Sequence, residues 1–504
     1  MINVKNLVRK KQSNFWNHVH FHPTDAIEDD WGQKILNEVA KDNVAKVIRM
    51  YAMLEDIVTM DENGDFVYDF TENDVRMDYI VEKGFTPLIS YAFVPKCLCE
   101  STDCLSSMAK GKTRYKGKYI ISSKPKDYKA WGEICRKYAE HIVERYGIDM
   151  VSTWYMQCYN EPCGGGFFMG EEKSYHIRTG EYCKLYENFA KGVKSVDERL
   201  KVGGSATTDF ALGFLEAFLN YAKLNNLPLD FVDAHTYGTM PQSINEKTRL
   251  LSIYNNIGHI CVYNNIIKKF FPEGKEFILD EWGPAACGFY NLEDCPTFIF
   301  RENSIFPTYF AKLVTNIIDN DMNVSKMLLC LSGQHEMTED FSGFRNFFSL
   351  NFIRKPIYNA YALMSRIKEN ILYSETDNPY VTVLASKDEK DNYSLAITYS
   401  SEHFGTETDT WDDGLPNFKD TVKIDDIHGD KCVTVWVIDD NNTNPYGVYK
   451  RKGYTKDLTK EQIEELKEVG RIKPVKQFNV HAEGKLEVDI ESTPNGLIFI
   501  EITA

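Results

Sequence analysis

The 504-residue chain has no apolar run long enough to cross a membrane, and no apolar stretch of signal-peptide length follows the basic residues near its N-terminus. We therefore expect a cytoplasmic protein. It also has no surplus of positive charge, since its net charge is -16 and its pI is near 5.3. Such a chain repels polyanions, so nucleic acids and membranes are not expected partners. A neutral small molecule is the more plausible ligand.

Metal-binding patterns are scarce as well. The chain has twelve cysteines, but the three in CLCESTDC, residues 97–104, have no matching downstream Cys/His pair for zinc. We interpret the cysteines as reduced thiols. His18, His20 and His22 alternate in HVHFH as a metal triplet would, yet no carboxylate partner can be named. We interpret them as pocket lining or packing, and we expect no metal and no organic cofactor.

The composition is that of a large globular protein. Hydrophobic residues make up 43% of the chain, aromatic residues 13% and charged residues 26%, which is enough for a sizeable core and a well-hydrated surface. A length of 504 residues exceeds one ordinary domain. We therefore expect two domains, one large and one small.

Eight β-rich segments alternate with longer segments of helical periodicity. The predicted strands are NFWNHVHF, KVIRMY, TPLISYAF, STWYMQCYN, KVGGSAT, FVDAHTY, FILDEWG and KMLLCLS, which begin at residues 14, 46, 86, 152, 201, 231, 277 and 326. Between them, segments such as 127–147 and 174–200 repeat apolar residues three and four apart. This alternation predicts an α/β fold, a (β/α)8 TIM barrel over residues 14–370. Its last helix is expected at 355–371.

After the barrel the pattern changes. Strand-like segments such as YVTVLAS, NYSLAITYS, CVTVWVIDD, KLEVDI and GLIFIEIT are separated by Asn, Asp, Gly and Pro turns. We predict a β-sandwich-like accessory domain over residues 371–504, which residues 1–13 would complete. Its single helical insert is expected at 458–470, on the surface.

Two carboxylates stand at the ends of predicted strands. Glu161 ends the fourth strand in YNEP, and Glu281 ends the seventh in FILDEWG. Active sites of such barrels lie at the C-terminal ends of the strands, so these residues can face each other across the barrel mouth. A single Glu at a strand end is often only a salt-bridge partner. Two of them on strands four and seven are harder to explain in that way.

This pair suits glycoside cleavage. One carboxylic acid protonates the leaving oxygen while the other carboxylate attacks the anomeric carbon, and water later releases the glycosyl-enzyme. An ionised Glu281 nearby would disfavour ionisation of Glu161 and keep it able to act as the acid. We predict that their carboxyl groups lie roughly 5 to 5.5 Å apart, the separation typical of retaining enzymes.

The chain resembles glycoside hydrolase family 39, the family of β-xylosidases and α-L-iduronidases, within the clan of retaining glycosidases whose acid/base follows an Asn on strand four. The resemblance covers residues 10–370. It rests on the segments FWN at 15–17, VIRMYA at 47–52, TPLISYAFVPKCL at 86–98, PKDYKAWGEICRKYAEHIVERYGID at 125–149, TWYMQCYNEP at 153–162, KVGGSA at 201–206, DFVDAHTYG at 230–238, DEWG at 280–283 and IRKPIYNAY at 353–361.

The resemblance implies a role for each matching residue. Glu161 would be the general acid/base and Glu281 the nucleophile. Asn160 would bind the sugar 2-hydroxyl, and Arg49 would keep Glu281 ionised. The further implied substrate-binding residues are His235 and Tyr237 on the nucleophile's side, and the rings of Tyr51, Phe93 and Trp282 as apolar faces for the sugar. Alternatives stay open, because Arg49 could close a core ion pair, His235 could be a core histidine, and the three rings could serve packing alone.

Departures from the family pattern fall on the substrate side. Tyr51 stands where the family's xylosidases usually have a histidine, and Cys330 stands near their strand-eight tryptophan. The loop CGGGFFMG, residues 163–170, is richer in glycine than theirs. Replacement polar contacts are expected from Gln334, His335 or Glu336, with Glu336 taken as the substrate-binding candidate.

We predict a retaining exo-glycosidase for short oligosaccharides, by default a β-D-xylosidase, and by resemblance a homo-oligomer. One alternative is another sugar specificity within the family, namely α-L-arabinosidase, β-galactosidase, β-glucosidase or α-L-iduronidase. An iduronidase needs a cation for the substrate carboxylate, for which Arg345 is a candidate. The other alternative is a barrel that binds carbohydrate without cleaving it, but such a module has no need of both Glu161 and Glu281.

Overall fold

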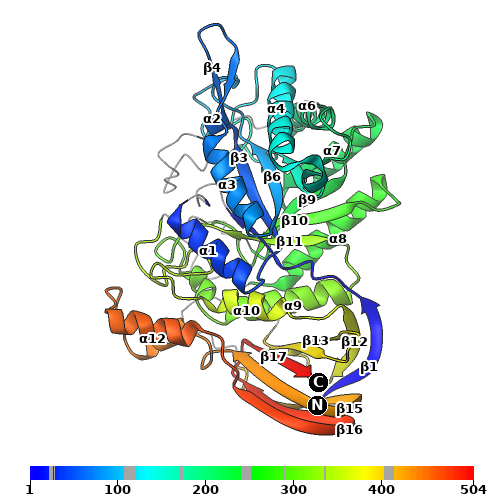
Figure 1. The fold of residues 1–504 in the computed structure, drawn as a ribbon, viewed down its shortest axis with the longest axis vertical. Helices are drawn as coiled ribbons and strands as arrows, with labels where there is room; N and C mark the ends of the chain where they lie inside the picture. The colour runs from blue at the N-terminus through cyan, green and yellow to red at the C-terminus, as the bar shows by residue number, and fades with distance from the viewer. Residues whose placement is uncertain are drawn as a thin grey trace.

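The computed structural model describes residues 1–21, 27, 29–106, 120–170, 174–239, 251–288, 290–333, 336–401 and 414–504. Its centre is a closed barrel of eight parallel strands in the order β10-β11-β2-β3-β6-β7-β8-β9 (Figure 1). The strands are β2 (His18–Phe21), β3 (Val47–Met53), β6 (Thr86–Ala92), β7 (Tyr155–Cys158), β8 (Lys201–Thr207), β9 (Phe231–Tyr237), β10 (Glu276–Gly283) and β11 (Lys326–Leu331). The predicted TIM barrel is confirmed, because each of the eight predicted segments overlaps one of these strands.

Helices surround the barrel. The longer ones are α1 (Asp30–Lys41), α3 (Thr71–Glu82), α4 (Tyr128–Tyr146), α6 (Tyr175–Lys194), α7 (Leu212–Leu224), α8 (Ile253–Phe270), α9 (Ile305–Asp319) and α10 (Pro356–Met364), and the short elements are α2 (Leu54–Ile57), α5 (Ile148–Val151), the 3-10 helix η2 (Pro296–Arg301) and the hairpin β4 (Val58–Met60) and β5 (Phe66–Tyr68). Helix α4 illustrates why they form. The Asp127 carboxylate caps its first turn, and Trp131, Cys135 and Tyr138 recur on its buried face.

The C-terminal region is one curled seven-stranded sheet. Its strands, in spatial order, are β1 (Ile2–Lys11), β12 (Asn370–Thr376), β13 (Val381–Lys387), β14 (Tyr393–Tyr399), β17 (Gly496–Thr503), β15 (Phe418–Ile438) and β16 (Lys476–Ser492). The first part of β15 pairs with β1 and its last part pairs with β17, so the sheet closes on itself. The first strand of the chain thereby joins the last part of the sequence, and both termini lie beside this sheet (Figure 1).

Two local predictions were wrong. The helix expected at 355–371 ends at Met364, and residues 370–376 form β12 instead, because they pair with β1 and β13. The accessory region also has a second helix, α11 (Pro445–Arg451), beside the predicted α12 (Lys460–Gly470). Tertiary pairing overrode local helical preference in the first case. The predicted boundary near residue 370 between two domains stays a prediction.

The sheet and the barrel share a core. Helix α9 contacts β13, β14 and β17, and Leu384, Ala396 and Phe499 of the sheet belong to the same buried cluster as the barrel. The opposite face of the sheet encloses a separate apolar cluster that includes Ile2 and Val4. Among the helices of the described ranges, none is both long and apolar enough to cross a membrane.

Candidate active site

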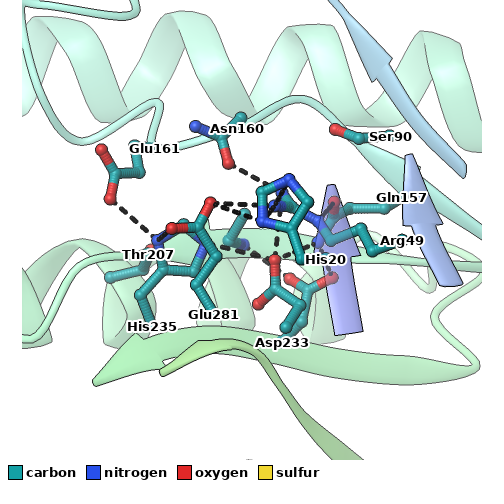
Figure 2. Close-up of polar contacts among 12 residues, drawn as sticks. His20, Arg49, Ser90, Gln157, Asn160, Glu161, Thr207, Asp233, His235 and Glu281 are labelled. Atoms are coloured by element: carbon teal, nitrogen blue, oxygen red, sulfur yellow. Dashed lines mark hydrogen bonds and ion pairs between the residues drawn. The ribbon is translucent and has the colours of Figure 1, made fainter. Parts of the chain in front are cut away.

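The predicted site residues meet at the C-terminal ends of the barrel strands. Arg49 comes from β3, Asn160 and Glu161 follow β7, and His235 and Glu281 come from β9 and β10. Figure 2 shows their polar groups converging on one small volume. All except Glu161 are buried, and the Glu161 side chain is only 17% exposed.

Arg49 is the hub of the site. Its Nη1 lies 2.9 Å from Glu281 Oε1, and its Nη2 donates to Asn160 Oδ1 at 2.7 Å. Its Nε donates to Gln157 Oε1 at 2.9 Å, and Asp280 Oδ2 lies 3.1 Å from Nη2. A guanidinium presents donors in a fixed fork, so one side chain orients four neighbours at once. Arg49 therefore closes a buried ion pair and contacts Glu281 at the same time, so both interpretations of this residue hold.

A β-bulge in β10 shapes the nucleophile side. The pairing of β10 with β9 shifts register between Leu279 and Glu281, and its pairing with β11 shifts between Leu279 and Trp282. A regular strand would turn consecutive side chains to opposite faces, but a bulge re-aims one of them. As a result Asp280 and Glu281 both reach the inner network, where both contact Arg49.

Glu161 stands on a tight turn after β7. Its backbone φ is 44°, in the left-handed region that a residue with a Cβ adopts at a cost of about 1 kcal/mol. Hydrogen bonds from Glu161 N to Ala206 O and from Gly164 N to Glu161 O hold the turn, at 3.1 and 2.9 Å. This turn aims the carboxyl group of Glu161 at His235 across the barrel mouth (Figure 2).

His235 lies between the carboxylates. Its Nδ1 is 2.8 Å from Glu161 Oε1 and 3.8 Å from Glu281 Oε2, and its Nε2 is 3.1 Å from Asp280 Oδ2. Burial works against its charge, yet the carboxylates of Glu281 and Asp280 raise the pKa of His235 well above its ordinary value. His235 therefore lies beside Glu281, as expected for the nucleophile's side, and its nearest carboxylate is that of Glu161.

The two glutamates have opposite electrostatic surroundings. Burial, together with the nearby Glu281, raises the pKa of Glu161, although His235 opposes this. Burial also opposes ionisation of Glu281, but the positive charges of His235 and Arg49, together with a hydrogen bond to His20, outweigh it and hold the pKa of Glu281 well below its ordinary value. Tyr237 Oη adds a hydrogen bond to Glu281 Oε2 at 2.7 Å. At a pH between the two pKa values, one carboxyl group is therefore protonated while the other is ionised.

The two carboxyl groups are close. One oxygen of Glu161 and one of Glu281 lie within 4.8 Å of each other. Such a nearest-oxygen distance is consistent with the separation of roughly 5 to 5.5 Å between the carboxyl groups of retaining glycosidases. The arrangement can donate a proton to a leaving oxygen while a carboxylate attacks from the other side.

Tyr51 and Phe93 occupy the wall beside this pair. Their rings stack at 6.0 Å, and the Arg49 guanidinium lies 5.1 Å from the centre of the Tyr51 ring. Tyr51 is 2% exposed, and its hydroxyl has no hydrogen-bond partner among the described residues. The expectation that the Tyr51 ring presents an open face to a sugar is therefore not met. The Tyr51 hydroxyl, and not its ring, is the group left without a partner among the described residues.

Trp282 does not face the site. It is completely buried, and its ring packs against Phe310 at 5.6 Å and Phe306 at 6.1 Å on α9. The bulge that turns Glu281 inward leaves its neighbour directed at the surrounding helices. The prediction that Trp282 supplies an apolar face for the sugar was wrong, and packing is its role.

The strand-eight side is built differently from the expected set. Glu336 is half-buried in the turn after β11, where its N–H bonds to Gly333 O, and Gln334 and His335 lie outside the described residues. Arg345 instead reaches the site. Its Nη1 donates to Tyr237 Oη at 2.8 Å and its Nη2 to Cys330 Sγ at 2.8 Å.

Several residues of the network were given no role at the site by sequence reasoning, or, like His20, only that of pocket lining or packing. Gln157 Nε2 donates to Asp233 Oδ2 and Asp280 Oδ2 at 2.6 and 2.7 Å, and His20 Nδ1 lies 3.3 Å from Glu281 Oε1. Burial and the charge of Asp280 raise the pKa of Asp233 to about 7. Period-two alternation in FVDAHTY would have found Asp233, since it shares a strand face with His235. No sequence signal marks Asp280, because its orientation depends on the bulge.

Two groups of described side chains have ligand atoms within 4.8 Å of one another and so could hold a metal ion: His20, Glu281 and Cys330, and Glu161, His235 and Glu281. Arg49 contacts both His20 and Glu281, and its positive charge works against a cation there. Of the HVHFH histidines, His18 accepts a backbone N–H of β3, and His22 lies outside the described residues. All twelve cysteines are free in the structure.

Comparison with known proteins agrees with this geometry. The family model described as glycosyl hydrolases family 39 matches residues 2–487. A β-xylosidase of Caldicellulosiruptor saccharolyticus is 24% identical over 491 residues, covering 95% of this chain and 93% of that protein. A second β-xylosidase, from Geobacillus stearothermophilus, is 34% identical over 170 residues, which are 34% of this chain and 31% of that protein.

Solved structures agree in fold. A monomeric β-xylosidase from Caulobacter crescentus superposes with a TM-score of 0.82 at 20% identity, covering 99% of both chains. The family 39 enzyme from Xanthomonas axonopodis pv. citri gives 0.80 at 19% identity, covering 99% of this chain and 96% of that one. At such identities these structures show the shared fold, while the family model spans nearly the whole chain. The protein thus belongs to glycosyl hydrolases family 39 and is a retaining glycoside hydrolase.

Proposed function

We propose that the protein is an exo-acting β-D-xylosidase for short oligosaccharides, with Glu161 as the general acid/base and Glu281 as the nucleophile. The observation that carries the roles is the opposite pKa shift of two carboxyl groups whose oxygens lie within 4.8 Å. The sugar is supported by the two bacterial relatives named β-xylosidase.

In the first step the ionised Glu281 attacks the anomeric carbon while Glu161 protonates the leaving oxygen. An imidazolium at His235 donates from Nδ1 to Glu161 Oε1 at 2.8 Å and from Nε2 to Asp280 Oδ2 at 3.1 Å. Because Oε1 is then occupied as an acceptor, the proton of Glu161 resides on Oε2, where it is available to the leaving group. In the second step Glu161, now a carboxylate, takes a proton from a water molecule whose oxygen attacks the anomeric carbon, and the bond between that carbon and Glu281 breaks to release the sugar.

Two further groups would bind the sugar in this proposal. Arg49 holds the carbonyl oxygen of Asn160, which leaves its NH2 turned toward Glu161 and free to donate to the 2-hydroxyl (Figure 2). The Tyr51 hydroxyl is buried and unsatisfied among the described residues, which is costly unless a ligand pairs with it. We assign it a contact with a substrate hydroxyl.

Other sugars within the family remain outcomes of the test. A uronide would need a cation for its carboxylate, and Arg345 was the candidate. Arg345 donates one hydrogen bond from each Nη atom, to Tyr237 and Cys330, while its Nε–H has no partner among the described residues, so the substrate panel decides between a neutral sugar and a uronide. A barrel that binds carbohydrate without cleaving it does not need two closely spaced carboxyl groups of opposite pKa shift.

The test is hydrolysis of a panel of nitrophenyl glycosides by the wild type and by Glu281→Ala. The panel holds the β-xyloside, α-L-arabinoside, β-galactoside, β-glucoside and α-L-iduronide. We expect the β-xyloside to be preferred and its turnover to vanish in Glu281→Ala. Added azide should restore activity in this variant by forming a glycosyl azide of inverted configuration, since a small anion fits where the carboxylate was removed.

Each outcome separates one part of the proposal. Preference for another sugar would replace xylose and leave the mechanism intact. Full turnover in Glu281→Ala would remove Glu281 from the role of nucleophile. A cytoplasmic location and a homo-oligomeric state also stay predictions, and light scattering after size-exclusion chromatography tests the second.

A further inference from the structure

Arg345 is a buried cation that packing alone does not explain. It lies in the segment after β11, is 4% exposed, and bonds through Nη1 to Tyr237 Oη and through Nη2 to Cys330 Sγ, both at 2.8 Å. Within the described ranges it has no carboxylate oxygen within 4.0 Å. Burying a positive charge without a direct anionic partner is costly, so the position calls for a functional reason.

The direction of the hydrogen bonds supplies that reason. A guanidinium can only donate, so Tyr237 Oη accepts from Arg345. The hydroxyl proton of Tyr237 is then directed to Glu281 Oε2 at 2.7 Å. Two hydrogen bonds in series thus link the Arg345 guanidinium to the Glu281 carboxylate. Because both end groups are charged, each of the two hydrogen bonds strengthens the other.

We propose that Arg345 is a positioning residue for the nucleophile, which acts on Glu281 through the Tyr237 hydroxyl. The inference rests on the proposed role of Glu281. Arg345 keeps the proton of Tyr237 on Glu281 Oε2, while Arg49 holds Oε1 directly. Both oxygens of the Glu281 carboxylate are thus held in place for attack on the anomeric carbon. The same contacts stabilise this carboxylate when it leaves as water releases the sugar.

A buried ion pair fixes the backbone next to Arg345. Glu302 accepts from Gly343 N at 2.7 Å and from Lys355 Nζ at 2.6 Å, and Lys355 Nζ also donates to Phe344 O at 2.9 Å. Glu302 and Lys355 are fully buried. This ion pair pins the two residues that precede Arg345, so its guanidinium cannot swing away from Tyr237 without breaking buried bonds.

Other charged or titratable groups also face Glu281, from every neighbouring strand. They are His20 on β2, Arg49 on β3, Glu161 after β7, His235 on β9, Asp280 on β10 and Cys330 on β11. Arg49 and His235 would still hold Glu281 ionised without Arg345. Loss of Arg345 should therefore weaken the nucleophile's charge stabilisation and leave part of it in place.

The test is the pH dependence of kcat/KM for an aryl β-xyloside, whose acid limb reports ionisation of Glu281 in the free enzyme. In Arg345→Met we expect kcat/KM at its optimum to fall about tenfold and the acid limb to move up by roughly one pH unit. Arg345→Lys, which keeps a donor, should recover part of both. Tyr237→Phe should show the same changes, and adding Arg345→Met to it should produce no further shift.

Arg354→Met is the matched control, because Arg354 belongs to the same segment but pairs with Asp42 at 3.0 Å, on the far side from the site. The acid limb of Arg354→Met should stay in place.

An equal shift by Arg345→Met in the Tyr237→Phe background would overturn the proposal, and so would an unmoved acid limb in both Arg345→Met and Arg345→Lys. If Arg345→Met spared the xyloside and abolished only iduronide hydrolysis, Arg345 would recognise a substrate carboxylate instead. Failure of the role of Glu281 would appear separately, as activity in Glu281→Ala.

Discussion

Two glutamates with the same ordinary pKa are driven in opposite directions by their neighbours. Burial and the proximity of Glu281 raise the pKa of Glu161, whereas His235, His20 and Arg49 overcome burial and lower that of Glu281. A carboxylic acid and a carboxylate can therefore coexist within 4.8 Å. The proposed division of labour between them follows from their surroundings, because the side chains are chemically identical.

These shifts predict a bell-shaped pH profile of kcat/KM. Activity requires Glu281 ionised, so it is lost as pH falls through the lowered pKa of Glu281. Activity also requires Glu161 protonated, so it is lost as pH rises through the raised pKa of Glu161. The active window lies between the two and spans the ordinary glutamate value of 4.5. Steady-state assays across pH measure both limbs, and in Glu161→Gln the alkaline limb should disappear.

Glu161→Gln should also separate substrates by leaving group. We expect a loss of about 10²- to 10⁴-fold in kcat/KM for a natural disaccharide, because its leaving oxygen needs a proton donor. A dinitrophenyl glycoside departs without protonation and should lose far less in its first step. Parallel kinetics on the two substrates measure the difference. Equal losses on both would contradict the role of Glu161 as the acid.

The Tyr51 hydroxyl offers a third test at this scale. Tyr51→Phe should lower kcat/KM about tenfold, since it removes one hydrogen bond to the substrate, and it should leave the melting temperature unchanged or higher. Tyr91→Phe is the matched control, because its hydroxyl is also buried and unpaired among the described residues, while its ring packs against Tyr138 and Phe189 outside the barrel. An equal loss in both variants would point to packing.

At the scale of the element, the bulge in β10 decides which side chains face the site. It brings Asp280 and Glu281 into the same polar network and leaves Trp282 to pack on α9. A single extra residue in the strand thus separates a catalytic candidate from a core residue next to it.

Trp282 should therefore matter for stability and little for sugar binding. Trp282→Ala is expected to lower the free energy of unfolding by about 3–5 kcal/mol, because it leaves a cavity between β10 and α9. Denaturant unfolding measures this loss. Trp282→Phe should keep most of the packing and a near-normal KM. A large increase in KM in a stable Trp282→Phe would restore the sugar-stacking interpretation.

At the scale of the whole molecule, the first strand closes the C-terminal sheet. β1 pairs with β12 on one side and with the start of β15 on the other, and Arg9 reaches Asp319 at the end of α9 at 2.7 Å. The N-terminal residues thus connect the curled sheet to the barrel (Figure 1).

Replacing Ile2 and Val4 together by Ala should destabilise this sheet. Both side chains are fully buried, so we expect the free energy of unfolding of the region to fall by about 3–6 kcal/mol. Hydrogen exchange of the sheet amides measures the effect. Leu7→Ala, at a position 59% exposed in the same strand, is the control and should be nearly neutral. Loss of activity with an intact sheet would contradict the structural role of β1.

Sequence reasoning succeeded where a pattern is local. The alternation of strands and helices predicts the barrel, and Arg49, Asn160, Glu161, His235 and Glu281 were named from strand ends and a family resemblance. It failed where local preference and tertiary context disagree. The helix predicted to run to residue 371 ends at Met364, and residues 370–376 pair as β12, while Trp282 follows Glu281 in the chain but packs on α9.

The sequence by itself determined the order of strands and helices, the family and the two carboxylates, because periodicity and motif spacing are properties of short segments. Only the tertiary structure decided that Asp280 joins the site, that Tyr51 offers its hydroxyl, and that Arg345 reaches Glu281 through Tyr237. These facts depend on a bulge, on ring packing and on a loop returning over the barrel mouth. Each of these contacts joins residues that are far apart in the chain, so no pattern within a short segment predicts it.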